Sequence, residues 1–362
     1  MSAINRRVLI QGDFLEDHMR LNRWLAVMLV AALLPSQAHA DAVADFYHGK
    51  TVTIYVGFGP GGGYDAYAQL LGQHIRRHIP GEPTVIVKHM PGAGSLTLMN
   101  YLWSVASPDG TAFGIPASSA AFVPLIGSPQ EKAAAKFDAA KFTWLGSLEK
   151  FTPIGLAWHT TGIRTVDDVK QRPLRFGSSG AASGGETYAQ LLNDMLGTRL
   201  VSIRGYRGSN DITLAIERSE LDGFVGWCWT CMKADKPQYH NEKLVNVFVQ
   251  FGRDADATAH GIPSALDLVT DPQDRQVMAL ILANLALSRP FVAPPNVPAE
   301  RTSALRRAFL ATAADAAFLA AASRAKRDIS VFTAEEIDKL LKESYALPAD
   351  TVRRAAEISA AR

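Results

Sequence analysis

Apolar and polar positions along the chain follow two alternating periods from residue 50 onward. Residues 51–58 are rich in β-branched and aromatic side chains, a composition that predicts a buried strand. A glycine cluster follows, and then an apolar stripe at helical spacing predicts a helix over 65–79. Residues 84–87 and 112–115 predict two further strands, with another helix ending near Trp103 between them.

The same alternation restarts in the middle of the chain. The predicted elements are, in order, a strand over 174–176, a helix over 185–196, a strand over 200–203, a helix over 209–218, and strands over 221–225 and 245–249. Repeated β-α-β units imply parallel strands joined by right-handed crossovers. We therefore expect an α/β protein of two lobes, the second inserted into the first. The crossing points are expected near 148–152 and 250–255.

The part of the chain after residue 255 is mostly helical in pattern. Pro298 suits the first turn of a helix. Thr333 and Glu336 have the spacing of a capping box, which predicts a last helix containing Ile337 and Leu340.

The N-terminus has the three parts of a secretory signal peptide. Two arginines precede an apolar run over 24–34, and an A-x-A pattern follows at 38–40. The run is too short to cross a bilayer, and the remaining alternative is a buried N-terminal helix. We expect residues 1–40 to be removed, with Met19 as the true start. The mature protein would begin near Asp41 and be soluble in the periplasm.

Length and charge narrow the class of protein. The 362 residues suggest two domains, which we place at 41–150 plus 251–362 and at 151–250. The formal net charge of +2 gives no reason to expect nucleic acid as a partner.

The chain contains two cysteines, Cys228 and Cys231, in a C-x-x-C spacing directly after a predicted strand. In an oxidising compartment this pair forms a short-loop disulfide or remains as two inert thiols. The C-x-x-C spacing also fits a redox site. A zinc site needs more ligands than this one pair of cysteines supplies.

The strongest local signal is the glycine cluster between the first strand and the first helix. Its flexible backbone and the unpaired N–H groups of the next helix make a seat for a carboxylate or phosphate. Asp65 is either the N-cap of that helix or a ligand contact. Gly57, Gly59 and Gly62 also satisfy a dinucleotide-binding G-x-G-x-x-G. The second strand, however, ends in Lys88 and His89 instead of the acidic residue that holds a ribose.

A second glycine and serine loop, residues 177–185, also lies between a strand and a helix. Two such loops facing each other across a cleft would hold an anion from both sides; the alternative is that both are turns with packing roles only. Arg204, Tyr206 and Arg207 follow the next strand, and an arginine offers two donors to a carboxylate. Nucleophile-elbow, H-E-x-x-H and P-loop motifs are absent from the sequence, and His74 and His78 lie on a basic stretch that suits a solvated surface.

Short motifs recur along the chain at Tyr55–Asp65, Pro91–Ser95, Pro108–Thr111, Gly177–Gly180, Tyr206–Gly208, Glu220–Asp222 and Pro290–Pro298. In this order they resemble the motifs of the solute receptors of tripartite tricarboxylate transporters, also called Bug proteins. The resemblance runs over about 50–345. The usual "PDVPT" is only partly matched by Gly261–Ser264, and the segment from Gly226 to Cys231, with its two tryptophans and two cysteines, is not typical.

The resemblance implies a type 2 periplasmic-binding-protein fold without a cofactor. It implies a monomeric receptor that binds a small organic acid and delivers it to membrane permease subunits. By position, the ligand-binding residues would be Pro60, Gly61, Gly62, Gly63, Tyr64, Asp65, Ser118, Ser119, Ser178, Ser179 and Gly180. Gly59 belongs to the same glycine loop and is included with them. To these we add Tyr206 and Arg207, because they follow a strand end and an arginine offers two donors to a carboxylate. We also add Trp227, because a tryptophan that lines the cleft would favour a larger or aromatic acid. The alternative for Trp227 is packing in the core.

Two other classes of function remain open at this point. One is an exported enzyme or redox protein that uses Cys228 and Cys231. The other is a ligand receptor that signals to a sensor kinase.

Overall fold

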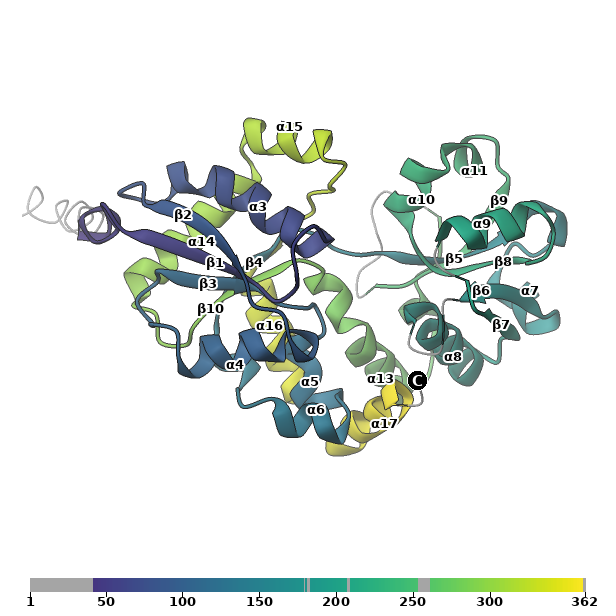
Figure 1. The fold of residues 1–362 in the computed structure, drawn as a ribbon. Coiled ribbons are helices and arrows are strands. Elements are labelled where there is room, and N and C mark those ends of the chain that lie inside the picture. Colours follow the sequence, from purple (N-terminus) through teal and green to yellow (C-terminus); the bar gives the residue numbers. More distant parts are fainter. Residues whose placement is uncertain (1–41, 179, 181–182, 207–208, 253–260, 361–362) are drawn as a thin grey trace, which may run out of the picture.

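The computed structural model describes residues 42–178, 180, 183–206, 209–252 and 261–360 (Figure 1). The expected signal peptide, Ser179 and Arg207 lie outside the described residues. Within the described part, two separate sheets form the two lobes of an α/β protein, as the alternating pattern predicts.

The first lobe contains a sheet of six strands in the order β11-β4-β10-β3-β1-β2. These strands are β1 (Thr51–Val56), β2 (Thr84–His89), β3 (Ala112–Ile115), β4 (Thr143–Ser147), β10 (Pro290–Ala293) and β11 (Phe332–Thr333). Strand β1 pairs in parallel with β2 and β3, whereas β10 lies antiparallel between β3 and β4.

Helices pack around this sheet (Figure 1). They are α3 (Gly63–Ile75), α4 (Leu96–Ser104), α5 (Val123–Ile126), α6 (Pro129–Ala134), α13 (Pro272–Leu282), α14 (Ala299–Ala313), α15 (Ala316–Arg324), α16 (Ala334–Tyr345) and α17 (Ala349–Ala360). The short helix α12 (Ala265–Leu268) precedes α13, and its N-cap Ser264 forms a bridge with Gln250 at the end of β9. The capping box of Thr333 and Glu336 is confirmed at the start of α16. The prediction that this helix is the last is wrong, because α17 follows it.

The second lobe contains a sheet of five strands in the order β7-β6-β8-β5-β9. The strands are β5 (Pro153–Trp158), β6 (Leu174–Ser178), β7 (Leu200–Arg204), β8 (Gly223–Cys228) and β9 (Val245–Gln250). Its helices are α7 (Val166–Gln171), α8 (Gly184–Leu196), α9 (Ser209–Glu217), α10 (Trp229–Asp235) and α11 (Pro237–Asn241).

The strand register places the two glycine loops at the edges where the chain passes between the lobes. In the first lobe, β4 ends at this passage, and β1 and β3 run in the same direction as β4 because β10 is antiparallel to both β3 and β4. In the second lobe, Pro153 at the start of β5 pairs with Cys228 at the end of β8, and β6 is parallel to β8. The carboxyl ends of β1 and β6 therefore lie on the sides of the two sheets from which the lobes are joined.

The C-terminal helix α17 makes a further link between the lobes. It packs against α13 and α5 of the first lobe and also contacts α8 of the second. Ala355, in the middle of α17, is fully buried. Among the described residues, none of the helices is both long enough and apolar enough to cross a membrane.

Candidate functional site

The first loop, residues 57–63, leaves β1 and leads directly into α3. Gly59, Gly61 and Gly62 have no other atom within 4 Å of the position where a side chain would begin. Gly61 has a φ of +86°, a conformation that favours glycine. Together with the exposed Pro60, these glycines form a backbone surface that a ligand can approach closely.

Asp65 closes this loop from within the first turn of α3. The N-cap of α3 is Gly62, so the interpretation of Asp65 as the N-cap is wrong. The carboxylate accepts the Gly61 N–H at 2.7 Å and lies 2.8 Å from His89 Nε2 and 3.2 Å from Gln69 Nε2. Burial alone would raise the pKa of Asp65, but these hydrogen bonds lower it below its usual range.

Tyr64 connects the first loop to the loop that follows β3. Its ring stacks on Phe58 with 4.3 Å between the ring centres, and its hydroxyl accepts the N–H of Ser118 at 3.1 Å. Ser119 begins the 3₁₀ turn over Ala120–Phe122. The structure thus brings Tyr64 and Ser118 together, as the resemblance implies for one binding site.

Ser95 joins the three loops that leave β1, β2 and β3, and it is missing from the residues chosen from sequence. The fully buried hydroxyl donates to the carbonyl of Gly57 at 3.1 Å and accepts the N–H of Ala117 at 3.0 Å. A side chain at Gly57 would collide with Ser95. The only sequence signal for this role is the position of Ser95 at the end of a motif, Pro91–Ser95.

In the second loop, residues 177–185, the described serines are Ser178 and Ser183, and they hydrogen-bond to each other. The buried Ser178 hydroxyl accepts the Gly180 N–H at 3.1 Å and lies 2.9 Å from the hydroxyl of Ser183, the N-cap of α8. Gly180 has a φ of +157° and open space where a side chain would stand. In this conformation Ser178 therefore shapes the loop instead of presenting its hydroxyl to solvent.

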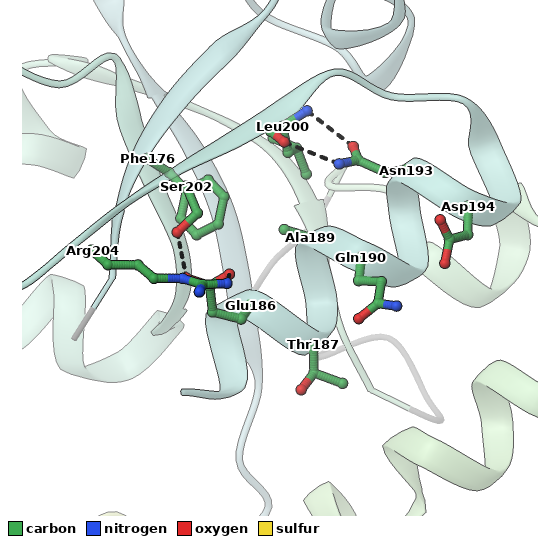
Figure 2. A pocket seen from close by; sticks show the side chains of 10 residues that line it. All are labelled: Phe176, Glu186, Thr187, Ala189, Gln190, Asn193, Asp194, Leu200, Ser202 and Arg204. Atoms are coloured by element: carbon green, nitrogen blue, oxygen red, sulfur yellow. Dashed lines mark hydrogen bonds and ion pairs between the residues drawn. The ribbon is translucent and has the colours of Figure 1, made fainter. Parts of the chain in front are cut away.

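Glu186, in the first turn of α8, is held by a base from the neighbouring strand. Arg204 at the end of β7 donates two hydrogen bonds to it, at 3.0 and 3.1 Å, and Ser202 donates another (Figure 2). Burial would raise the pKa of Glu186, but the hydrogen bonds from Arg204, Ser202 and Ser178 lower it. Arg204, considered above as a ligand contact, is thus paired with a carboxylate of the protein.

Beside this pair, a polar cavity of ≈ 170 Å³ lies between α8 and β7. Figure 2 shows Gln190 and Asp194 along the same helix, away from the Glu186–Arg204 pair. The sequence analysis did not identify this cavity, because the register of β7 against β6 determines which side chains meet α8.

The two aromatic candidates of the second lobe differ in position. Tyr206 is half-buried, and its N–H donates to the carbonyl of Ser178 at 3.2 Å, next to the second loop. Trp227 is 6% exposed and stacks on Phe224 with 5.3 Å between the ring centres. Trp227 therefore packs in the core of the second lobe, which corrects the interpretation that it lines the cleft.

Cys228 and Cys231 are joined by a disulfide at the start of α10. Cys228 is also the N-cap of that helix, and its sulfur accepts the Cys231 N–H at 3.0 Å. Trp229, which follows Cys228 in the chain, donates its N–H to the carbonyl of Thr152 at 2.9 Å. The disulfide therefore closes the first turn of α10, and the Trp229 hydrogen bond ties the end of β8 to the segment that joins the lobes. Among the described residues, no group of three or more histidines, cysteines or carboxylates is placed to hold a metal ion.

Comparison with known proteins identifies the fold of the chain. No family model and no curated protein sequence matches it. Among solved structures, a ligand-free TctC solute-binding protein from Polaromonas has a TM-score of 0.66 and 15% identity, covering 85% of this chain and 99% of that one.

Two other solved structures have the same arrangement. The periplasmic binding protein BugD has a TM-score of 0.51 and 16% identity over 86% of this chain and 97% of its own. An R. palustris protein with adipate has a TM-score of 0.53 and 15% identity over 85% of this chain and 97% of its own. The predicted two-lobed α/β fold is thereby confirmed: this chain has the fold of the TctC and BugD periplasmic solute-binding proteins.

Proposed function

We propose that the protein is a periplasmic solute receptor that captures a small organic carboxylate between its two lobes. The observation that carries this proposal is the pair of glycine loops at the joined edges of the two sheets. Each loop leads into a helix of thirteen residues, α3 or α8, whose first N–H groups have no intrahelical partner. Two helix N-termini favour negative charge from both sides of the cleft.

The ligands of proteins with the same fold support a carboxylate over other anions. One R. palustris structure contains adipate, and another, MatC, contains malate with a TM-score of 0.50 to this chain. The motifs around both loops also resemble those of tripartite tricarboxylate transporter receptors. We infer that the closed, loaded receptor delivers the acid to the membrane subunits of such a transporter and that it acts as a monomer without catalysis.

The proposal includes the division into lobes and the mode of capture. The lobes are 41–150 plus 251–362 and 151–250, with residues 1–40 as the export signal. In the open form the acid meets one loop, and hinge closure brings the N–H groups of the other loop onto it. The direct contacts are assigned to the backbone of residues 59–63 and of Gly180, with Tyr64, Ser118, Ser119 and Tyr206 beside them. The proposed set also includes Ser179, which the resemblance implies, and Arg207, which follows the strand end with Tyr206.

The test is a thermal-shift screen of the purified protein against mono-, di- and tricarboxylic acids, with amino acids and aromatic acids included. A ligand of the folded state adds RT ln(1 + [L]/Kd) to the free energy of unfolding, about 2.7 kcal/mol at a hundredfold excess over Kd. We expect a clear rise in Tm with one class of carboxylate. A flat response to every acid, with a shift from a nucleotide or a turnover of substrate instead, would overturn the proposal.

A further inference from the structure

Arg289 places a positive charge beside the first turn of α3, where the first loop ends. Its guanidinium lies 4.6 Å from the ring centre of Tyr64 and 5.2 Å from that of Tyr67. Its Nη2 atom is 3.2 Å from the position that a Cβ would take on Gly63. A side chain at Gly63 would therefore crowd the guanidinium, which lies against the backbone of the helix start.

The hydrogen-bonding capacity of Arg289 is only partly used. Its Nη1 donates to the carbonyl and the hydroxyl of Ser288, at 2.7 and 3.0 Å, and its Nη2 lies 3.3 Å from Glu149 Oε2. The buried Nε has no hydrogen-bond partner among the described residues. A buried donor left unpaired is costly, and nearly all such groups in native proteins have a partner in the protein or in a bound water or ion.

Glu149, the anionic partner, belongs to the segment that joins the lobes. It lies between the last residue of β4, Ser147, and the first residue of β5, Pro153. Its carboxylate also accepts the hydroxyl of Ser288 at 3.0 Å, and the next residues of the segment are tied to the first lobe by a bond from the Phe151 N–H to the Leu285 carbonyl. The Arg289–Glu149 pair therefore connects the hinge to the start of α3.

We propose that Arg289 is a ligand-binding residue of the receptor and that it contacts the carboxylate held by the first loop. The inference rests on the proposed function and adds a residue that its motifs do not include. In the ligand-free form Glu149 balances the charge of Arg289. An incoming carboxylate competes with Glu149 for the guanidinium, so the two anions act in opposition.

This competition gives the two partners opposite effects on affinity. Loss of the guanidinium removes a charged contact to the acid, whereas loss of the Glu149 charge leaves the guanidinium available to the acid. A merely structural ion pair behaves differently, because breaking it from either side would disturb the same loop. The sign of the change in Kd therefore separates the two roles.

The experiment uses the full protein and every acid that raises its Tm in the screen, with adipate and malate always included. Isothermal titration gives the Kd of each acid for wild type, Arg289→Gln, Arg289→Lys, Glu149→Gln and Arg301→Gln. Arg301 is the matched control, since its side chain has the same 21% exposure, lies 3.9 Å from the Phe46 ring centre and donates to the Asp109 carbonyl. Urea unfolding without acid reports whether each variant is folded.

We expect Arg289→Gln to weaken binding about tenfold or more, the range for a lost hydrogen bond between charged groups. Arg289→Lys should restore part of that loss, Glu149→Gln should tighten binding, and Arg301→Gln should leave it unchanged. Equal weakening by Arg289→Gln and Glu149→Gln, or a wild-type Kd for folded Arg289→Lys and Arg289→Gln, would overturn the inference and leave the receptor intact. Absence of binding by the wild type would overturn the proposed function and this inference with it.

Discussion

In the first lobe, β1, a glycine loop, α3 and β2 follow one another, and in the second lobe β6, a glycine loop, α8 and β7 do the same. Each helix carries a carboxylate at its third residue, Asp65 or Glu186. Each following strand ends in a base that pairs with this carboxylate, His89 or Arg204. The two bases occupy equivalent positions, because His89 is in register with Val56, and Arg204 with Ser178, the last residues of β1 and β6.

The two lobes nevertheless use this arrangement differently. Asp65 accepts an N–H of its own loop, from Gly61, so the carboxylate determines the shape of the first loop. In the second loop Ser178 and Ser183 hydrogen-bond to each other, and Glu186 interacts with Ser178 of the loop as well as with Ser202 and Arg204 of β7. Asp65 thus holds the backbone of the first loop, whereas Glu186 contacts the second loop only through the Ser178 side chain.

The largest expected difference concerns the glycines at the helix starts. A Cβ on Gly185 would collide with the Val225 carbonyl, whereas a Cβ on Gly62 meets no atom within 4 Å and the φ of Gly62 is −84°. We expect Gly185→Ala to lower the free energy of unfolding by about 2–3 kcal/mol, the cost of overpacking. Gly62→Ala should change it by less than about 0.5 kcal/mol. Urea denaturation checks both, and equal losses would show that the first loop is as closely packed as the second.

The next largest effect is expected from neutralising the two carboxylates. Asp65→Asn leaves one acceptor atom where two served Gly61, Gln69 and His89, and it should lower the free energy of unfolding by about 2 kcal/mol. Glu186→Gln should cost about 1 kcal/mol, since its main partner, Arg204, is 58% exposed. The control is Asp167→Asn, which removes the carboxylate of the solvent-exposed Asp167–Lys170 pair and should leave the free energy of unfolding unchanged. If Glu186→Gln lowered the free energy of unfolding more than Asp65→Asn, the carboxylate would matter more in the second lobe than in the first.

The same pair of variants has a defined dependence on pH. The pKa values of Asp65 and Glu186 lie below their usual 3.8 and 4.5, so the folded chain binds fewer protons than the unfolded chain in this range. The stabilisation is complete above these usual values and is lost as the pH falls through the lowered ones. As the pH falls below 4.5, the free energy of unfolding of both variants should therefore decrease less steeply than that of wild type. Curves parallel to wild type would contradict the assignment.

The smallest effects are expected from the bases. His89→Gln keeps an N–H donor for Asp65, and Arg204→Lys keeps the charge but loses the two-point contact with Glu186. Both variants should unfold close to the urea midpoint of wild type, with Arg204→Lys slightly lower. If either variant shifts the midpoint as far as Asp65→Asn, the bases contribute more to their pairs than this geometry indicates.

The sequence predicts the elements with local signals and misses those without them. The strands before both glycine loops are confirmed, as is the helix capped by Thr333. Strands β4 and β10 have no alternating pattern because four of five residues of β4 and all four of β10 are buried. Their pairing joins segments more than 140 residues apart, a contact that no local pattern indicates.

In the candidate site, too, the features with a local sequence signal are predicted and those that depend on distant segments are missed. The glycine loops are visible in the sequence as clusters between a strand and a helix. The partners of Asp65 and Glu186 are not, because the register of neighbouring parallel strands decides that His89 and Arg204 end beside them. Arg289 comes directly before one of the family-like segments, Pro290–Pro298, but its place beside α3 depends on the antiparallel insertion of β10.

The contact of α17 with both lobes restricts the motion of one lobe relative to the other. Two chain crossings alone would let the second lobe both bend toward the first and twist about the line between them. A helix that is packed on α13 and α5 and also touches α8 removes much of the twisting freedom. For the proposed closure we therefore expect bending along one path with little rotation of one lobe against the other, so that the two loops approach each other in the same alignment each time.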